Sequence, residues 1–332
     1  MKYAKDTRPK PVSSRTAEVL VEALPWIKNI TGKTVVIKYG GSAMVDGQLR
    51  TDVMNDIVLL KIIGINPVII HGGGLAITDA MNKFNIPVEF KEGQRVTTDE
   101  AMEVVRMVLM GKVNQELVEA MNEHGNLAVG VSGSDAGTIM AEQKSPELGR
   151  VGRITRINSG YLEDLINADY IPVVASIAMG EEGGYYNVNA DLVAGHIAAA
   201  IGAHKIVFLT DVDGLYEDFE RKDSLISNLT MFEAQYMVEN NVVSTGMIPK
   251  LQSCISALEA GVFRAHIING TTPHALLLEL LTNTGVGTTL HSTEESCTFD
   301  AHPLGNFAAK LIENRQHPVL LSEQNGVRTP NR

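Results

Sequence analysis

A regular alternation of two kinds of segment constrains the fold of this chain more than any other feature. Short apolar runs rich in β-branched residues are typical of buried strands, and they span residues 34–39, 66–71, 127–132, 171–176, 205–210 and 265–270. Longer stretches with helical spacing lie between them, at 48–63, 75–84, 100–124, 190–201 and 248–260. Strands that are apolar on both faces and alternate with helices predict a mainly parallel central sheet covered on both sides, a three-layer α/β/α sandwich.

Three segments fall outside this alternation. A helix is expected from Ser14, with Ser13 or Ser14 as its cap, and Pro25 is expected to kink it or to end its first part. Turn glycines and alternating polarity over residues 138–162 predict hairpins that project from the sheet. The last segment, 296–332, has little periodicity and is expected to be a peripheral or partly disordered tail.

Charge and composition exclude several classes of function. A formal net charge of -11 argues against nucleic acid as a partner, because binding to a phosphate backbone is driven by Lys and Arg. No run approaches the roughly 18 apolar residues of a membrane span, and the first residues lack the apolar core of a signal peptide. We therefore expect a cytoplasmic protein that binds no membrane. Cys254 and Cys297 are the only cysteines, and their distance in sequence indicates neither a disulfide framework nor a thiolate metal site.

Two glycine-rich turns carry the strongest functional signal. Lys38 stands near the end of one apolar run and is followed by Gly40 and Gly41, while the next run leads into the triple glycine 72–74 and an expected helix. Glycines let backbone amides approach an anion closely, and a helix N-terminus attracts negative charge. Either turn alone could be only a tight turn. Two such turns at the carboxyl ends of strands in one sheet predict a site for the phosphates of a nucleotide.

The familiar phosphate-binding motifs do not account for these turns. Gly32, Lys33 and Thr34 match the end of a P-loop, but Ile27 stands where its first glycine belongs. The triple glycine lacks the third glycine of the dinucleotide-binding pattern, because Ile77 occupies that position. The site is therefore neither a P-loop nor an ordinary Rossmann site.

Polar residues near three other predicted element ends extend this picture. Asn187, Asn189 and Asp191 alternate just before a helix, where a plain N-cap is the other interpretation. Asp211, Asp213 and Gly214 follow a strand, and a simple turn is equally consistent with them. Lys250 lies near the start of a helix, where a solvated lysine is the ordinary case.

Taken in order, these segments resemble the amino acid kinase family. The resemblance runs from about Ala17 to Thr289 and rests on KYGGSAM, VIIHGGG, GQRVT, VGRITRIN, YIPVVASI, NVNAD, FLTDVDGLY and GMIPKL. It implies the family's α/β/α fold with an N-terminal extension helix. Within the family, the members that transfer the γ-phosphoryl group of ATP to the side-chain carboxylate of N-acetyl-L-glutamate, in arginine biosynthesis, are the most similar.

The resemblance also implies roles for individual residues. Lys38 and Lys250 would neutralise charge on the transferring phosphoryl group from opposite sides, and Asp191 would hold both ammonium groups in place. Backbone amides of Gly41, Gly73 and Gly74 would bind the phosphoryl oxygens. The substrate would contact Arg95 and Asn187 through its α-carboxylate, together with Asn189, Gly73 and Gly74. The implied ATP-binding residues are Lys38, Gly40, Gly41, Thr210, Asp211, Gly214, Tyr216, Gly246 and Lys250.

A second part of the resemblance concerns regulation. The N-terminal helix around Trp26 and the segment 266–288 are similar to the arginine-inhibited members, in which that helix interlaces dimers into a homohexamer, a trimer of dimers. The implied arginine-binding residues are Trp26, His266, Glu279 and Gly287. Glu279 suits a guanidinium group, although an exposed helix charge is the alternative. Ser134 and Ala136 depart from the pattern, which leads us to expect a lysine and a glycine there.

The implied chemistry agrees with the residue types. A carboxylate nucleophile is already ionised at neutral pH, so no general base is needed and His71 is assigned a structural role. No carboxylate cluster with ligand spacing is evident, so magnesium is expected to arrive with ATP rather than in a protein metal site.

The sequence suggests four regions and leaves two alternative functions open. Residues 1–30 form an arm and helix, 31–180 a lobe for the amino-acid substrate, 181–295 a lobe for ATP and arginine, and 296–332 a tail. Another acceptor (aspartate, glutamate, carbamate or a nucleoside monophosphate) and a non-catalytic arginine sensor on the same fold remain possible.

Overall fold

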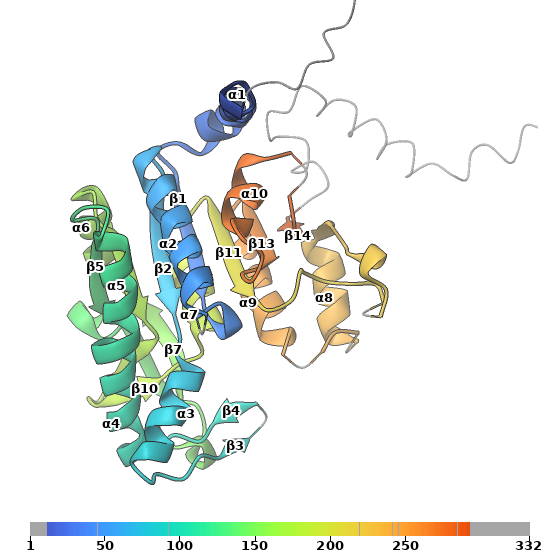
Figure 1. The fold of residues 1–332 in the computed structure, drawn as a ribbon. Helices are drawn as coiled ribbons and strands as arrows, with labels where there is room; N and C mark the ends of the chain where they lie inside the picture. The colour runs from blue at the N-terminus through green and yellow to red at the C-terminus, as the bar shows by residue number, and fades with distance from the viewer. Residues whose placement is uncertain are drawn as a thin grey trace, which may run out of the picture.

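The computed structural model describes residues 12–292, apart from residues 45, 92, 219, 241, 245 and 284. The expected tail at 296–332 and Cys297 lie outside the described residues. Figure 1 shows helices packed around one large sheet, with α1 (Val12–Ile30) at one end of the molecule.

The large sheet has the strand order β12-β14-β13-β11-β1-β2-β8-β5. Six of its strands match the predicted ones: β1 (Thr34–Tyr39), β2 (Asn66–His71), β5 (Ala128–Ser132), β8 (Ile171–Ala175), β11 (Lys205–Thr210) and β13 (Arg264–Asn269). The sequence analysis missed β12 (Asn228–Thr230) and β14 (Thr288–His291) at one edge. Only β13 and β14 pair antiparallel within this sheet. The mainly parallel sheet is therefore confirmed.

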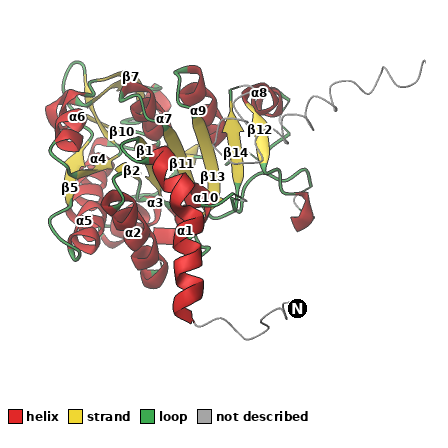
Figure 2. Ribbon diagram, turned by 90° about the horizontal axis from the view of Figure 1, so that it is seen from above, coloured by secondary structure: helices red, strands yellow, loops and turns green. Residues whose placement is uncertain are grey.

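Alternate residues of the strands face two helical layers, because side chains of a strand point to opposite faces in turn. Val35, Ile37 and Ile69 pack into one apolar core with α2 (Gly47–Ile62), α3 (Gly74–Lys83) and α10 (Ala275–Leu281). Val36 and Val68 pack into a second core with α6 (Gly160–Asn167), α7 (Ala190–Ala200), α8 (Met231–Glu239) and α9 (Ile248–Glu259). Figure 2 shows the two groups of helices on opposite sides of the strands, which confirms the three layers.

The predicted helix at 100–124 is three consecutive helical segments. It begins as α4 (Asp99–Val108), which Thr98 caps, and ends as α5 (Gln115–Asn122). Between them, residues Leu109–Asn114 form a π-helical turn, η2. Such turns insert an extra residue into a helix and are frequent at functional sites.

The segment after β5 contains a hairpin, as predicted, which belongs to a smaller sheet that was not predicted. β6 (Ile139–Gln143) and β7 (Gly152–Ile157) pair antiparallel, and β9 (Ile177–Gly180) and β10 (Tyr185–Asn187) complete a four-stranded sheet. A short hairpin of β3 (Phe90–Lys91) and β4 (Gln94–Arg95) lies separately. Before β6, Ala136 has φ 50, the left-handed region, which explains why the family pattern leads us to expect glycine there.

The N-terminal helix begins earlier than predicted. Helix α1 begins at Val12, so Ser13 and Ser14 lie inside the helix rather than at its cap. It continues past Pro25 to Ile30, which contradicts one of the two effects expected of that proline, an end to the first part of the helix. Trp26 and Ile27 are half-buried against the core beneath it.

Two of the four expected regions, 31–180 and 181–295, share the large sheet. Strands between residues 31 and 180 form one half of it, and strands between 181 and 295 form the other, with β1 pairing directly with β11. No helix of the described residues is long and apolar enough to cross a membrane.

Candidate active site

Two lysines meet one aspartate where β1, α7 and α9 converge. Lys38, near the end of β1, lies with its Nζ 2.9 Å from Asp191 Oδ1, and Lys250 Nζ lies 3.2 Å from Asp191 Oδ2. Asp191 and Lys250 come from the first turns of α7 and α9. The Lys38 contact is an ion pair without hydrogen-bond geometry at Oδ1, whereas Lys250 donates a hydrogen bond. The three predicted charged residues are thus brought together.

Burial and charge act in opposite directions on Asp191, whose side chain is 8% exposed. Burial alone raises the pKa of its carboxyl group, but the ammonium groups of Lys38 and Lys250 outweigh that effect and hold the pKa below its usual range. Asp191 is therefore a carboxylate at neutral pH. It partly neutralises two cations that remain accessible at one side.

Gly40 makes room for the Lys38 ammonium group. A Cβ atom at Gly40 would lie 2.9 Å from Lys38 Nζ, so any larger residue displaces the lysine. Gly41 follows with φ 74, in the left-handed region that favours glycine, and begins the short helix η1 (Gly41–Met44). The first glycine turn thus combines a cation with a backbone conformation that favours glycine at the end of β1.

The second glycine turn opens α3. Gly73 is the N-cap of this helix and no side chain caps it. The first amides of a helix have no partner within it and form the positive end of its dipole. A Cβ atom at Gly73 would lie 2.8 Å from Leu109 Cδ2, so glycine is required there by close packing. The turn therefore has no side-chain partner at the start of α3, which is consistent with the expected anion site.

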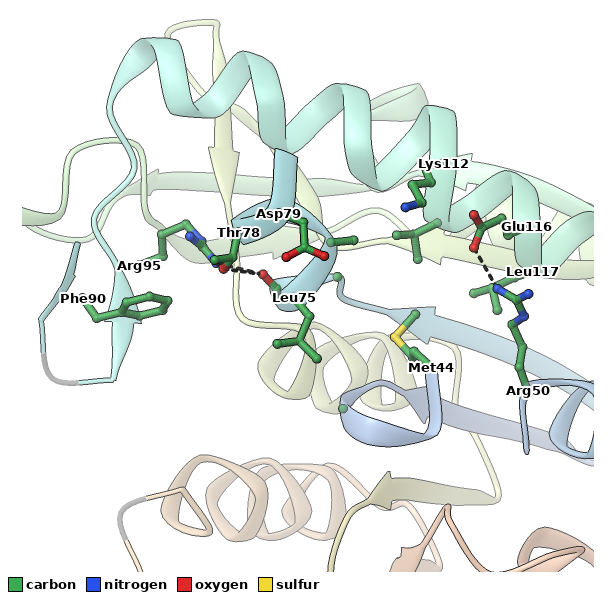
Figure 3. A pocket seen from close by; sticks show the side chains of 15 residues that line it. Met44, Arg50, Leu75, Thr78, Asp79, Phe90, Arg95, Lys112, Glu116 and Leu117 are labelled. Carbon is green, nitrogen blue, oxygen red and sulfur yellow. Dashed lines mark hydrogen bonds and ion pairs between the residues drawn. The ribbon is translucent and has the colours of Figure 1, made fainter. Parts of the chain in front are cut away.

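Both turns line one cavity of about 700 Å³. Figure 3 shows Arg95, Thr78 and Phe90 at one end of it and the ion pair Arg50–Glu116 at the other. Arg95 donates to Gly74 O at 2.9 Å and to Thr78 Oγ1 at 2.6 Å, and its guanidinium carbon lies 4.8 Å from the centre of the Phe90 ring. The cavity joins the amides of Gly41, Gly73 and Gly74 to a buried cation suited to a carboxylate.

The two asparagines lie apart from the described lining of this cavity. The side-chain Nδ2 of Asn187 is 3.3 Å from Thr97 Oγ1, and the backbone amide of Asn187 donates to Arg150 O. The Asn189 side chain accepts from the amides of Asp191 and Leu192, so it caps α7, the plain alternative considered for it. Its capping fixes the start of the helix that presents Asp191.

The loop after β11 is held by side-chain contacts. Thr210 is buried at the strand end and donates to Asp211 Oδ1 at 3.2 Å. Tyr216 donates to Asp213 Oδ2 at 2.5 Å, which raises the pKa of its hydroxyl group to about 12, and Asn269 donates to Asp213 Oδ1 at 2.8 Å. Asp213 is therefore the anchor of this loop.

Two glycines lie at the remaining positions of the expected nucleotide site. A Cβ atom at Gly214 would lie 2.4 Å from Thr288 Oγ1, so close packing requires glycine there. Gly246 is exposed ahead of α9, the helix that carries Lys250.

The residues expected to bind arginine form a buried network. Glu279 Oε1 accepts from His266 Nδ1 at 2.7 Å and from Thr289 Oγ1 at 3.0 Å, while Oε2 accepts from the amides of Val286 and Gly287. Glu279 is 7% exposed, so it is not the exposed helix charge considered as an alternative. Trp26 lies on α1, which packs against α10, the helix that carries Glu279.

His71 and its surroundings show what sequence reasoning missed. His71 is buried, as expected for a structural role, and its ring contacts Gly72 O and Asn114 Nδ2. Asn114 gave no signal in the sequence, because its position depends on the π-helical turn. Thr78 could have been found, since it lies one helical turn after Gly74 and faces the same side.

Among the described residues, no group of three or more His, Cys, Asp or Glu side chains could hold a metal ion.

Comparison with known proteins places this arrangement in a family. The family model described as "Amino acid kinase family" matches residues 33–269. An acetylglutamate kinase from Caldanaerobacter subterraneus is 50% identical over 274 residues, which cover 82% of this chain and 92% of that protein. An acetylglutamate kinase from Trichodesmium erythraeum is 49% identical over 81% of this chain and 93% of that protein.

Solved structures share the fold. An N-acetylglutamate synthase from Neisseria gonorrhoeae, solved with coenzyme A and N-acetyl-glutamate, is 25% identical with a TM-score of 0.73; the match covers 83% of this chain and 63% of that one. A carbamate kinase from Giardia lamblia bound to AMP-PNP is 17% identical with a TM-score of 0.61, over 79% of this chain and 99% of that one. The chain belongs to the amino acid kinase family.

Proposed function

We propose that this enzyme transfers the γ-phosphoryl group of MgATP to the side-chain carboxylate of N-acetyl-L-glutamate. The observation that carries the proposal is the buried Asp191 between Lys38 and Lys250, beside two glycine turns that line one cavity with Arg95. The relatives named acetylglutamate kinase support the choice of acceptor.

The reaction needs stabilisation of charge rather than proton transfer. A carboxylate oxygen of the acceptor attacks the γ-phosphorus, the bond to the bridging oxygen of ADP breaks, and an acyl phosphate and ADP leave. The attacking carboxylate is ionised at neutral pH. The catalytic task is to hold the groups in line and to bind the negative charge spread over the phosphoryl oxygens.

Lys38 and Lys250 supply positive charge on two sides of the phosphoryl group, and Asp191 keeps their ammonium groups apart and oriented. The amides of Gly41, Gly73 and Gly74 donate to the phosphoryl oxygens. Arg95 binds the α-carboxylate of the acceptor from one end of the cavity, and Asn187 of β10, outside the described lining, is assigned to the same carboxylate. Magnesium enters with the nucleotide as part of the substrate.

We assign the nucleotide to the half of the molecule after residue 180 and the acceptor to residues 31–180. The nucleotide segment comprises Thr210–Tyr216 and Gly246–Lys250. Its anchoring contacts through Asp213 keep the loop in one arrangement before ATP binds.

We also propose arginine inhibition and a hexameric assembly. His266, Glu279 and Gly287 form one network that α1 approaches through α10. The four donors already on Glu279 mean that an arginine guanidinium must displace some of them.

The acceptor is tested by a coupled assay of ADP release. N-acetyl-L-glutamate, aspartate, glutamate, carbamate and nucleoside monophosphates are compared, with and without arginine. We expect turnover with N-acetyl-L-glutamate and a lower rate when arginine is added. Turnover with another acceptor alone would refute the assignment.

Lys250→Ala separates catalysis from arginine binding. The variant loses a cation that contacts the phosphoryl group, so kcat should fall about 100-fold or more. Arginine binding, measured by calorimetry, should be unchanged because Lys250 does not contact the Glu279 network. If the protein were a non-catalytic arginine sensor, the parent would show no turnover. Unchanged turnover in Lys250→Ala would exclude the phosphoryl-transfer mechanism that relies on Lys250.

A further inference from the structure

The π-helical turn η2 packs directly on the second glycine turn. Leu109 and Val113 contact Gly73, where an added Cβ atom would lie 2.8 Å from Leu109 Cδ2 and 3.2 Å from Val113 Cγ2. Asn114, the last residue of the turn, reaches across to His71. Gly130 of β5 leaves the space that the Asn114 side chain fills, since a Cβ atom there would lie 2.0 Å from Asn114 Oδ1. The irregular helix thus meets the glycine turn through Leu109 and Val113, and it meets the preceding His71 through Asn114.

A chain of hydrogen bonds connects Val173 of β8 to the carbonyl oxygen of Gly72. Asn114 Nδ2 donates to Val173 O at 2.8 Å and to His71 Nε2 at 3.0 Å. The carbonyl partner identifies this atom of Asn114 as the nitrogen, so Nε2 of His71 must accept. The proton of the neutral ring is then on Nδ1, which donates to Gly72 O at 3.0 Å. Burial lowers the pKa of His71 to about 4, so the ring is neutral at physiological pH.

This chain determines which way the peptide between Gly72 and Gly73 faces. In a trans peptide the carbonyl oxygen and the amide hydrogen point in opposite directions. With Gly72 O held against the buried His71 ring, the Gly73 amide points away from that ring. Gly73 lines the cavity, and no side chain caps this end of α3.

Such a restraint is needed because three successive glycines are free to adopt several backbone conformations. Rotation of the Gly72–Gly73 peptide by half a turn would present a carbonyl oxygen to the cavity instead of an amide. A carbonyl dipole in that position would repel the phosphoryl oxygens that the amide stabilises. The turn therefore requires a contact outside itself to keep the donor facing the substrate.

We propose that His71 and Asn114 are positioning residues, which orient the Gly72–Gly73 peptide so that the Gly73 amide faces the phosphoryl group in transfer. The inference rests on the proposed phosphoryl transfer. His71 acts through its Nδ1 atom and Asn114 acts by holding the ring in the tautomer that carries the proton there.

Two matched variants separate positioning from packing. In His71→Asn, the side-chain amide of the new asparagine reaches the place of Nδ1 and can still donate to Gly72 O. In His71→Gln, the side-chain amide of the new glutamine reaches the place of Nε2 and keeps only the contact with Asn114. We expect His71→Gln to lower kcat about 10- to 100-fold with KM for both substrates within about threefold. His71→Asn should stay within about tenfold of the parent kcat. Equal kcat in the two variants, at temperatures where both are folded, would overturn the proposal.

Two further measurements do not depend on turnover. MgADP with aluminium fluoride mimics a phosphoryl group in transfer, and its affinity should be at least tenfold weaker in His71→Gln than in His71→Asn; equal affinities would contradict the inference. In the parent enzyme, NMR of ¹³C-labelled histidine should report the Nδ1–H tautomer of His71 from pH 8 to pH 5. The other tautomer would refute the positioning role of His71, and this measurement does not depend on whether a variant folds. Absence of turnover with N-acetyl-L-glutamate in the parent enzyme would instead refute the proposed function alone.

Discussion

At the scale of single residues, charge and backbone conformation decide what the site can do. Asp191 is stabilised as a carboxylate by Lys38 and Lys250, so its pKa lies below the usual range. A depressed pKa in the folded state means that the contribution of this carboxylate to stability is present above its ordinary pKa near 3.9 and is lost only as the pH falls through the lower value. The Asp191 charge is therefore constant over the pH range of catalysis.

Ala136, between β5 and β6, offers a test of backbone strain. Its φ of 50 lies in the left-handed region, which costs a residue with a Cβ atom about 1–2 kcal/mol. Ala136→Gly should therefore raise the free energy of unfolding by up to about 1 kcal/mol, because the entropy of the unfolded chain offsets part of the gain. Urea denaturation followed by circular dichroism measures the change.

The neighbouring Gly137 provides the matched control. It has φ 59, and an added Cβ atom would make only ordinary contacts, 3.4 Å from Met140 Sδ and 3.6 Å from Asn158 Nδ2. Gly137→Ala should lower the stability by a similar amount. A stability loss in both variants would show that Ala136 is not strained.

At the scale of elements, one carboxylate joins α10 to the edge of the sheet. Glu279 of α10 accepts hydrogen bonds from His266 of β13, from Thr289 of β14 and from the amides of the loop between α10 and β14. Burial raises the pKa of Glu279, but these donors outweigh it and lower the pKa to about 2. Because Glu279 binds both β13 and β14, which run antiparallel, its side chain fixes where α10 packs against the sheet.

Glu279→Gln should lower the free energy of unfolding by about 1–3 kcal/mol, because an amide has one acceptor oxygen and leaves buried donors unpaired. Urea denaturation at pH 7 measures the loss. Because the pKa of Glu279 is depressed in the folded state, the contribution of the carboxylate is full above its ordinary value of 4.5 and is lost as the pH falls toward 2. The difference in the free energy of unfolding between the parent protein and Glu279→Gln should therefore shrink below about pH 4.5.

Glu163→Gln on α6 is the control for this comparison, since Glu163 is exposed. Its stability should differ from that of the parent by less than about 0.5 kcal/mol. If Glu279→Gln behaves like this control, the network contributes nothing to folding.

At the scale of the whole molecule, α1 has an apolar face that the other described residues leave exposed. Val19, Leu20, Val21 and Leu24 are 58–70% exposed on it. Trp26 and Ile27 follow about two turns after Val19 and Leu20 on the same side of the helix, and there they pack on the core. A contiguous exposed apolar surface of this kind marks an interaction site, which agrees with the proposal that this helix joins dimers into a hexamer.

Deletion of residues 1–28 should yield smaller oligomers that arginine no longer inhibits, because the apolar face and Trp26 are both removed. Light scattering measures the mass, and the ADP-release assay measures turnover with and without arginine. Turnover without arginine should persist, since Lys38, Asp191 and Lys250 lie outside the deleted segment. A deletion variant that is still hexameric would contradict the assembly.

Much of the molecule could be predicted, for reasons that differ between its parts. The six long strands of the large sheet and the sites after β1 and β2 follow from local pattern, because apolar runs and glycine turns are properties of contiguous residues. β12 and β14 were missed because each is short and pairs only through distant partners. Neither the start of α1 at Val12 nor its continuation past Pro25 could be read from capping residues.

The sequence by itself determined the layered α/β architecture and the two glycine turns at the carboxyl ends of neighbouring strands, because a parallel sheet brings these ends to one edge. The grouping of Asp191 and Lys250 with Lys38 was implied only by the resemblance to a family. Only the tertiary structure decided how the glycine amides are oriented, since Asn114 reaches His71 through a π-helical turn and space above Gly130. Such contacts depend on packing between segments far apart in the chain, which no local pattern records.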